Sequence, residues 1–268
     1  MADGLPADVA KLLDPTMEFE TFDTATIGGS TYYFIDQFDD VDGEPVIVRQ
    51  APGKAPETVN DILPEDDATG GAASELSEKL QERLRAIRGT DFEDAGGDIG
   101  GGVSLTQQQV NEKLNRQAGH CADGNHSDHL ISKNAPGTNN GRLACAWAVN
   151  QVAKMALGRQ IGGGLATANM VLVLRQKHGS IETPVPGCVI ISPTVSTPHG
   201  RNIGHVGIIG SVSTGNLGDT RIYSNSSSRG QFEQNFSYGA WLSRYRDTKH
   251  LSVELFQLAP SAFPSATS

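Results

Sequence analysis

Three residues have the types and local settings that nucleophilic attack by a thiolate requires, and the first is a cysteine. Cys145 lies in "GRLACAWAVNQV", where a helical pattern begins. A cysteine in the first turn of a helix experiences the partial positive charge of the unpaired N–H groups, which favours the nucleophilic thiolate. The same N–H groups can bind the oxyanion of an acyl-transfer intermediate. A packing role is the alternative, because free cysteine is among the most buried residue types.

The second candidate is His205, which heads the apolar run in "NIGHVGIIG". Strand alternation places His205 and Ile209 on one face of this strand and Val206 on the other. A general base for Cys145 has to meet it in space and not in sequence, so a histidine on another element is suitable. A buried structural histidine is the alternative interpretation.

The third candidate is Asn225, in "RIYSNSSS" on the next predicted strand. A base histidine needs a polar group that holds its tautomer and ring orientation, and Asn225 is predicted to supply it. On this interpretation Ser224 faces the opposite side of the strand, and Asp219 in the preceding turn is a weaker candidate. Turn chemistry at a strand end is the alternative role for Asn225.

The elements that would position these residues follow an α+β order. Helices are predicted from Ser104 as N-cap, from Ala144 to Gly158, and from Thr167 as cap to Gly179. Four short strands follow, in "CVIIS", "HVGIIGSV", "RIYSNS" and "VELFQL".

In this order, "ACAWAVNQV", "PVPGCVIIS", "GHVGIIG" and "IYSNSS" resemble the NlpC-type and CHAP-type branch of papain-like cysteine peptidases, over roughly residues 135–260. The resemblance implies a papain-like core of helices packed on an antiparallel sheet. It also implies Cys145 as nucleophile, His205 as base and Asn225 as orienting residue, with no cofactor. The implied reaction is hydrolysis of a peptidoglycan amide, within the stem peptide or between muramic acid and alanine.

Other residues are candidates for contact with substrate. Asn139 or Asn140 is placed to supply a second oxyanion donor, and Trp147 follows the cysteine on its helix. His199 lies in the long loop "SPTVSTPHGRN", which could rim the site, and it competes with His205 as base. Where the resembling families have an aspartate after Pro-Gly, this chain has Cys188.

The N-terminal part of the chain differs sharply in charge from the rest. Residues 1–100 carry 23 acidic and 7 basic side chains, a net charge of −16, whereas residues 101–268 carry 8 and 14, a net charge of +6. We therefore predict an acidic, β-rich region at 1–50, a linker with a short helix at 51–100, and the catalytic domain at 101–268. "DDVDGE" lacks the ligand spacing of a calcium loop and is predicted to be a turn.

Metal binding and disulfide formation are both open from the sequence. "GHCADGNHSDH" gathers His120, Cys121, His126, Asp128 and other possible ligands, but its spacing matches no established zinc pattern, and no metal is predicted. The chain has three cysteines, so at least one thiol is free, and a bridge between Cys121 and the cysteine at position 188 remains possible.

Composition excludes some classes of protein. No run of about 18 apolar residues exists, so membrane insertion is not expected. The basic residues form no dense stripe of the kind that reads nucleic acid. The first residues lack a Sec signal pattern, so a peptidoglycan enzyme would reach the wall by a phage or a secretion machine. An inhibitor or delivery protein could then contact the acidic region. The alternatives are a protease, deamidase or acyltransferase acting on protein, and a non-catalytic binding module.

Overall fold

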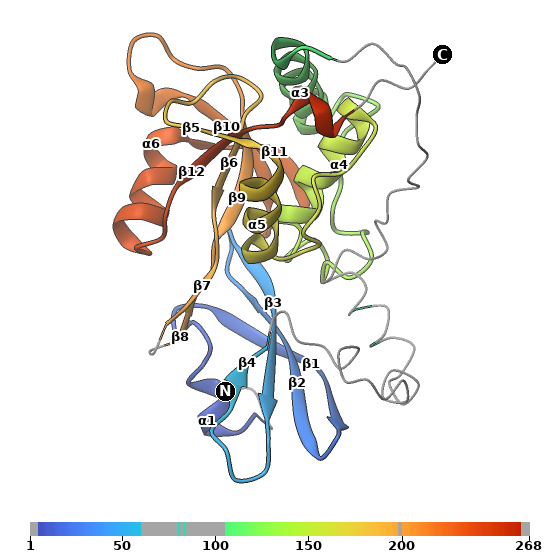
Figure 1. The fold of residues 1–268 in the computed structure, drawn as a ribbon, viewed down its shortest axis with the longest axis vertical. Coiled ribbons are helices and arrows are strands. Elements are labelled where there is room, and N and C mark those ends of the chain that lie inside the picture. The colour runs from blue at the N-terminus through green and yellow to red at the C-terminus, as the bar shows by residue number, and fades with distance from the viewer. Residues whose placement is uncertain (1–4, 60–79, 81–82, 84–104, 198–199, 264–268) are drawn as a thin grey trace.

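The computed structural model is an α+β fold built on antiparallel sheets (Figure 1). It describes residues 5–59, 80, 83, 105–197 and 200–263. The predicted linker and the predicted boundary near residue 100 therefore lie largely outside the described residues. Of the predicted short helix Ala73 to Arg88, only Leu80 and Arg83 are described, and both are helical and buried.

The N-terminal region forms a four-stranded antiparallel sheet in the order β1-β2-β3-β4, which confirms the predicted β-rich character. Its strands are β1 (Glu18–Ile27), β2 (Ser30–Phe38), β3 (Gly43–Gln50) and β4 (Glu57–Thr58), and a short helix, α1 (Ala7–Ala10), packs against it. Val46 and Val48 of β3 meet Val9 and Leu13 on the α1 side. Ile47 points the other way into a second apolar cluster. β3 is thus buried on both faces, as its unbroken apolar run requires.

The C-terminal region forms a six-stranded sheet in the order β11-β10-β9-β6-β12-β5. Its strands are β5 (Gly179–Ile181), β6 (Val189–Ser192), β9 (His205–Ile209), β10 (Arg221–Ser226), β11 (Gln231–Ser237) and β12 (Glu254–Gln257). The four predicted strands are therefore confirmed as β6, β9, β10 and β12. The other two, β5 and β11, were not predicted.

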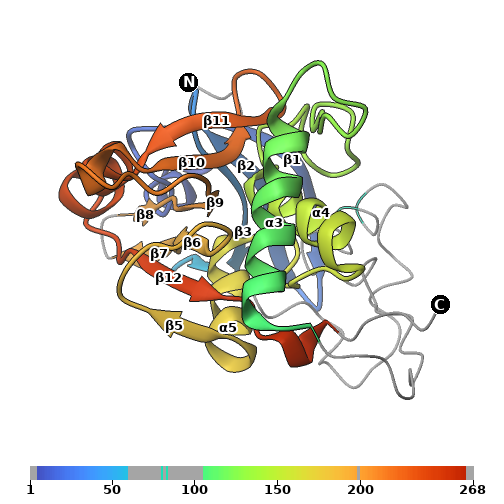
Figure 2. The ribbon, with the colours of Figure 1, turned by 90° about the horizontal axis from the view of Figure 1, so that it is seen from above.

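Helices cover this sheet on one face, and a helical segment that follows β11 covers the other (Figure 2). The first group is α3 (Gln107–Ala122), α4 (Cys145–Leu157) and α5 (Thr167–Lys177). The second is α6 (Tyr238–Trp241), continued by the π-helical segment Leu242–Thr248. Val206 and Ile208 belong to the core under the helices, and Ile209 to the opposite core, which confirms the predicted alternation along β9.

The helix ends differ from prediction in two places. Thr106, and not Ser104, is the N-cap of α3, where it forms a capping box with Gln109. Thr167 is the first residue of α5, after Ala166 as N-cap, and its hydroxyl bonds to Thr194. The end of α4 at Gly158 is as predicted, with the left-handed φ of 81° that favours glycine there.

The long loop after β6 does not simply rim a site. It forms a hairpin, β7 (Val195–Thr197) and β8 (Gly200–Asn202), which extends from the C-terminal sheet toward the N-terminal one (Figure 1). Gly200 lies against the Leu13 carbonyl so closely that a Cβ would be 2.3 Å from that oxygen. The two sheets are therefore held together partly by this hairpin. Among the described residues, no helix is long and apolar enough to cross a membrane.

Candidate active site

Cys145 is the first residue of α4 and is almost completely buried, with 2% of its surface exposed. It packs in the same buried cluster as Val206 of β9. Val206 directly follows His205, so the cysteine and histidine segments meet, as predicted. Burial raises the pKa of the Cys145 thiol well above its usual range, and the acidic neighbours Glu44 and Asp42 raise it further. In this arrangement Cys145 is a protonated thiol.

His205 is fully buried where β9 begins, opposite Ser192 of β6. Its ring lies among aromatic side chains, with centroid distances of 5.4 Å to Trp241 and 5.9 Å to Tyr245, and the ring of Tyr245 is nearly parallel to it. Burial lowers the pKa of His205 to about 4, although the nearby Asp42 carboxylate acts in the opposite direction. The imidazole is thus neutral near pH 7, which is the protonation state of a general base.

A short hydrogen-bond chain orients this ring. Nε2 of His205 lies 3.0 Å from Oγ of Ser224, and that hydroxyl donates to Oδ1 of Asn235 at 2.6 Å. Because the Ser224 proton is given to Asn235, Ser224 accepts from Nε2–H, which leaves Nδ1 as the basic nitrogen. Asn235 falls at a register shift between β10 and β11, and such β-bulges re-aim side chains.

The structure does not bring Asn225 to His205, and the predicted facing of Ser224 is wrong. Ser224 pairs directly with Gly207, and directly opposed residues project from the same face of a sheet, so Ser224 shares the face of His205. Asn225 points to the other face. There it accepts from Ser132 at 2.5 Å and donates to the Gly141 carbonyl at 2.8 Å, which holds the segment before α4. Asp219, the weaker candidate, is exposed in a 3-10 turn.

The acidic N-terminal region contributes a carboxylate to the site. Asp42, fully buried, lies in the turn between β2 and β3 (residues 39–42), and its Oδ1 is 3.2 Å from Nδ1 of His205. This contact does not have the geometry of a hydrogen bond, so Nδ1 of His205 is buried without a hydrogen-bond partner. "DDVDGE" is a turn, as predicted, because Oδ1 of Asp39 accepts from the N–H groups of Val41 and Asp42.

Three further side chains surround the Asp42 carboxylate. The Tyr245 hydroxyl donates to Oδ1 at 2.5 Å, while Arg244 at 2.7 Å and Lys249 at 2.8 Å bind Oδ2. Burial alone would raise the pKa of Asp42, but its interactions with His205 and with the cations Lys249 and Arg244 hold it below its ordinary value. Asp42 is therefore an ionised carboxylate enclosed by donors.

A second carboxylate of the same segment, Glu44, is also buried. Its Oε2 accepts from the Thr194 hydroxyl, and the backbone N–H groups of Thr167 and Ala168, which begin α5, act to favour its ionised form. A carboxylate at a helix N-terminus is favoured by the unpaired N–H groups there. Burial raises the pKa of Glu44, and the charge of Arg201 opposes that rise.

The predicted substrate-binding residues have other surroundings. Asn140 is exposed, in a left-handed turn with φ 54°. Trp147 is half-buried and packs against both the helical core and the N-terminal cluster around Phe34, so it joins the two regions. His199 lies outside the described residues.

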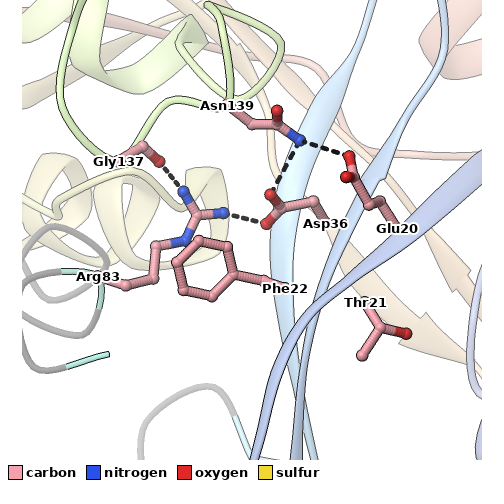
Figure 3. Close-up of a pocket in the computed structure, with 7 residues that line it drawn as sticks. All are labelled: Glu20, Thr21, Phe22, Asp36, Arg83, Gly137 and Asn139. Carbon is pink, nitrogen blue, oxygen red and sulfur yellow. Dashed lines mark hydrogen bonds and ion pairs between the residues drawn. The ribbon is translucent and has the colours of Figure 1, made fainter. Parts of the chain in front are cut away.

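Asn139, the other predicted oxyanion donor, lines a pocket beside the N-terminal sheet (Figure 3). Its amide donates to Asp36 at 3.0 Å, and Asp36 also pairs with Arg83. Arg83 donates to the Gly137 carbonyl as well. This network ties the loop before α4 to β2 and occupies the side-chain amide of Asn139.

The three cysteines are all free. Cys121 belongs to the core under the helices and Cys188 to the core on the opposite face of the sheet, so the possible bridge between them is not formed. Burial raises the pKa of Cys188 to about 12, and it also raises that of Cys121.

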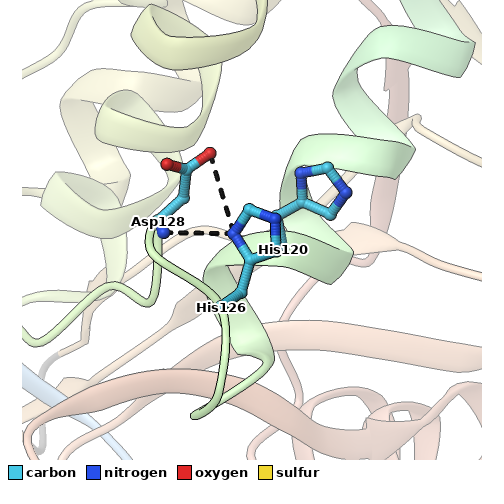
Figure 4. A group of neighbouring side chains, drawn as sticks. All are labelled: His120, His126 and Asp128. Atoms are coloured by element: carbon cyan, nitrogen blue, oxygen red, sulfur yellow. Dashed lines mark hydrogen bonds and ion pairs between the residues drawn. The ribbon is translucent and has the colours of Figure 1, made fainter.

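The histidine-rich segment gathers three possible metal ligands. Side-chain ligand atoms of His120, His126 and Asp128 lie within 4.8 Å of one another (Figure 4). The imidazoles of the two histidines stack at 4.0 Å, and Nδ1 of His126 accepts from the Asp128 backbone N–H. Cys121 turns away toward Met155. The three clustered groups could hold a divalent ion, although no metal was predicted.

Comparisons with family models, with curated proteins and with solved structures found no match to this chain. The assignment of function therefore depends on the geometry of the site.

Sequence reasoning missed Ser224, Asn235 and the Asp42 cluster. Ser224 was within reach, because pairing "HVGII" with "RIYSNS" in register places it on the histidine face. Asp42 was not, because nothing in "DDVDGE" shows that this turn is inserted beside a histidine from another sheet.

Proposed function

We propose that the chain is a papain-like cysteine hydrolase that cleaves amide bonds of bacterial peptidoglycan, with Cys145 as nucleophile and His205 as general base. The observation that carries the proposal is the packing of Cys145 in one buried cluster with Val206, the residue that follows His205. It joins a helix-start cysteine to a strand-start histidine, the arrangement expected from the NlpC-type and CHAP-type resemblance.

Ser224 takes the orienting role for which Asn225 was predicted. With Nε2–H held by Ser224, Nδ1 of His205 is the nitrogen that accepts the Cys145 proton. The sulfur then attacks the amide carbon, and N–H groups in the first turn of α4 stabilise the oxyanion. His205 gives its proton to the leaving amine. Water adds to the thioester carbon, its proton passes to His205 and then to sulfur, and a carboxylic acid is released.

The two catalytic residues are closed off in this arrangement, which gives the non-catalytic alternative a specific observation in its favour. Cys145 and His205 are buried, and Nδ1 faces Asp42 where a base would face a thiol. If this arrangement is permanent, the protein binds its partner without cleaving it. If the N-terminal segment moves away, the same residues form a hydrolase site.

Digestion of purified sacculi distinguishes these cases. Sacculi are incubated with the wild-type chain, with Cys145→Ala and with Cys188→Ala, and soluble muropeptides are identified by mass spectrometry. We expect release that is abolished by Cys145→Ala and retained by Cys188→Ala, and the products name the bond. Release by Cys145→Ala that equals the wild-type release and exceeds a buffer control contradicts the proposal, and cleavage of protein substrates alone favours the protease alternative. Delivery to the wall by a non-Sec route stays part of the proposal.

A further inference from the structure

The surroundings of Asp42 are those of a bound anion. One carboxylate, with no exposed surface, accepts from the Tyr245 hydroxyl, the Arg244 guanidinium and the Lys249 ammonium group. Lys249 also donates to the Ile203 carbonyl, beside the start of β9. Removing the carboxylate would leave Lys249 without a carboxylate partner among the residues that the structure describes and Arg244 with Asp39 alone, which is costly unless another anion replaces it.

The Asp42 carboxylate also conflicts with the reaction. Ser224 holds Nε2 of His205, so only Nδ1 can accept the Cys145 proton, and Nδ1 faces Asp42. That nitrogen is fully buried and has no hydrogen-bond partner. Asp42 contacts the nitrogen that has to work as base, so it cannot act as a third catalytic residue that orients the ring from behind.

The segment that carries Asp42 is seated by complementary contacts. The Ser227 hydroxyl donates to the carbonyls of Val41 and Arg142, and the Ser228 N–H donates to the Asp40 carbonyl. Gly43 packs directly on the Arg142 carbonyl, where a Cβ would be 2.1 Å from the oxygen. Arg244 binds Asp39 as well as Asp42. Acidic side chains of the N-terminal sheet thus occupy basic positions of the C-terminal region.

We propose that Arg244, Tyr245 and Lys249 form a carboxylate subsite of the active site, and that residues 39–44 block it as a built-in pseudosubstrate. This inference rests on the proposed hydrolase function. The substrate it implies is an amide with a free carboxylate close to the bond that is cleaved. When the segment leaves, the subsite binds that carboxylate, Nδ1 becomes available to Cys145, and the thiol becomes accessible.

Alkylation of Cys145 reports the position of the segment without requiring hydrolysis. Gly43→Ala keeps every charge but introduces the clash with the Arg142 carbonyl, whereas Gly215→Ala is the matched control because a Cβ there meets nothing within 4 Å. With the full-length chain near pH 7.5, we expect iodoacetamide to label Cys145 at least tenfold faster in Gly43→Ala than in the wild type or Gly215→Ala. Peptide mapping separates Cys145 from Cys121 and Cys188. A folded Gly43→Ala that labels no faster overturns the pseudosubstrate.

Acetate tests the subsite itself. In Asp42→Ala the donors are kept and the carboxylate is removed, so acetate can replace it. We expect faster labelling of Cys145 in Asp42→Ala, slowed at least fivefold by 50 mM acetate but not by acetamide or by sodium chloride of equal concentration. Asp42→Ala combined with Arg244→Ala should lose the acetate effect. Equal effects of acetate and acetamide overturn the subsite.

A second readout covers the case in which Asp42→Ala does not fold. Saturation-transfer NMR of Gly43→Ala should then detect acetate bound to the vacated subsite, and no binding to the wild type, whose subsite Asp42 fills. No binding to Gly43→Ala overturns the subsite. If acetate binds and Cys145 becomes reactive while sacculi stay intact, the hydrolase proposal fails and the subsite remains.

Discussion

An oxygen of Asp42 lies 3.2 Å from Nδ1 of His205, although Asp42 belongs to the turn of the N-terminal sheet and His205 begins a strand of the C-terminal one. This relationship gives the uneven charge of the chain a structural reason. The acidic region supplies carboxylates, Asp39, Asp42 and Glu44, that are bound by donors of the mildly basic region. It also explains why Cys145 and His205 are both buried and inaccessible to a substrate.

Ser224→Ala should reduce catalysis without unfolding the protein. Losing the Ser224 hydroxyl frees Nε2 of His205, so the wrong tautomer becomes populated and fewer molecules present a basic Nδ1. We expect kcat for amide hydrolysis, measured in the Gly43→Ala background, to fall at least about tenfold with KM little changed. Ser226→Ala on the same strand is the control, because within the described part of the chain that hydroxyl has one side-chain hydrogen bond, to Ser228 at 3.4 Å. A higher KM with kcat unchanged would argue against an orienting role.

Asn225→Ala should act on stability instead. It removes two buried hydrogen bonds and leaves the Gly141 carbonyl unsatisfied. We expect a loss of about 1–3 kcal/mol in the free energy of unfolding, measured with urea, while the alkylation rate of Cys145 in the Gly43→Ala background changes less than about threefold. If unfolding is unaffected and catalysis falls by more than about tenfold, Asn225 has the orienting role predicted from the sequence.

The difference between Ser224 and Asn225 shows what could be predicted from the sequence. The apolar runs of β6, β9, β10 and β12 and the pattern of α4 follow from side-chain periodicity, so the positions of Cys145 and His205 were predictable. The face of a polar residue at a strand end depends on register, and here a β-bulge at Asn235 also intervenes. A one-residue error in register exchanges Ser224 for Asn225.

Contacts between the two sheets were not predictable for a different reason. Residues 39–42 form a turn through local hydrogen bonds, and these say nothing of what the Asp42 carboxylate meets. Trp147 was expected to contact substrate because it follows Cys145, but it lies in the apolar junction with the N-terminal sheet. Such long-range contacts depend on the packing of whole sheets, which a single sequence does not encode locally.

Acid should destabilise the protein before the exposed carboxylates are protonated. The pKa of His205 is about 4 when folded and near 6.5 when unfolded, so between these values the unfolded state binds more protons and stability falls as pH falls. From pH 6.5 to pH 5 we expect His205 to account for a loss on the order of 2 kcal/mol. His178, with a pKa also lowered to about 4, adds a loss of the same sign. Asp42, with its lowered pKa, loses its contribution only at still lower pH.

Urea unfolding at pH 7 and pH 5 checks this dependence. The free energy of unfolding of His205→Asn should differ less between pH 7 and pH 5 than that of the wild type. His178→Asn should retain the part of this difference that His205 contributes. If His205→Asn and the wild type lose equal stability, His205 is not buried in its neutral form.

The central claim is that Cys145 and His205 hydrolyse a peptidoglycan amide once residues 39–44 are displaced. The most direct measurement is the release of muropeptides from sacculi by Gly43→Ala, compared with Gly43→Ala combined with Cys145→Ala. The account predicts soluble fragments with one newly formed amine and one newly formed carboxylate, absent from the double variant. Equal release by both variants, or no release by a folded Gly43→Ala whose Cys145 is reactive, would contradict it.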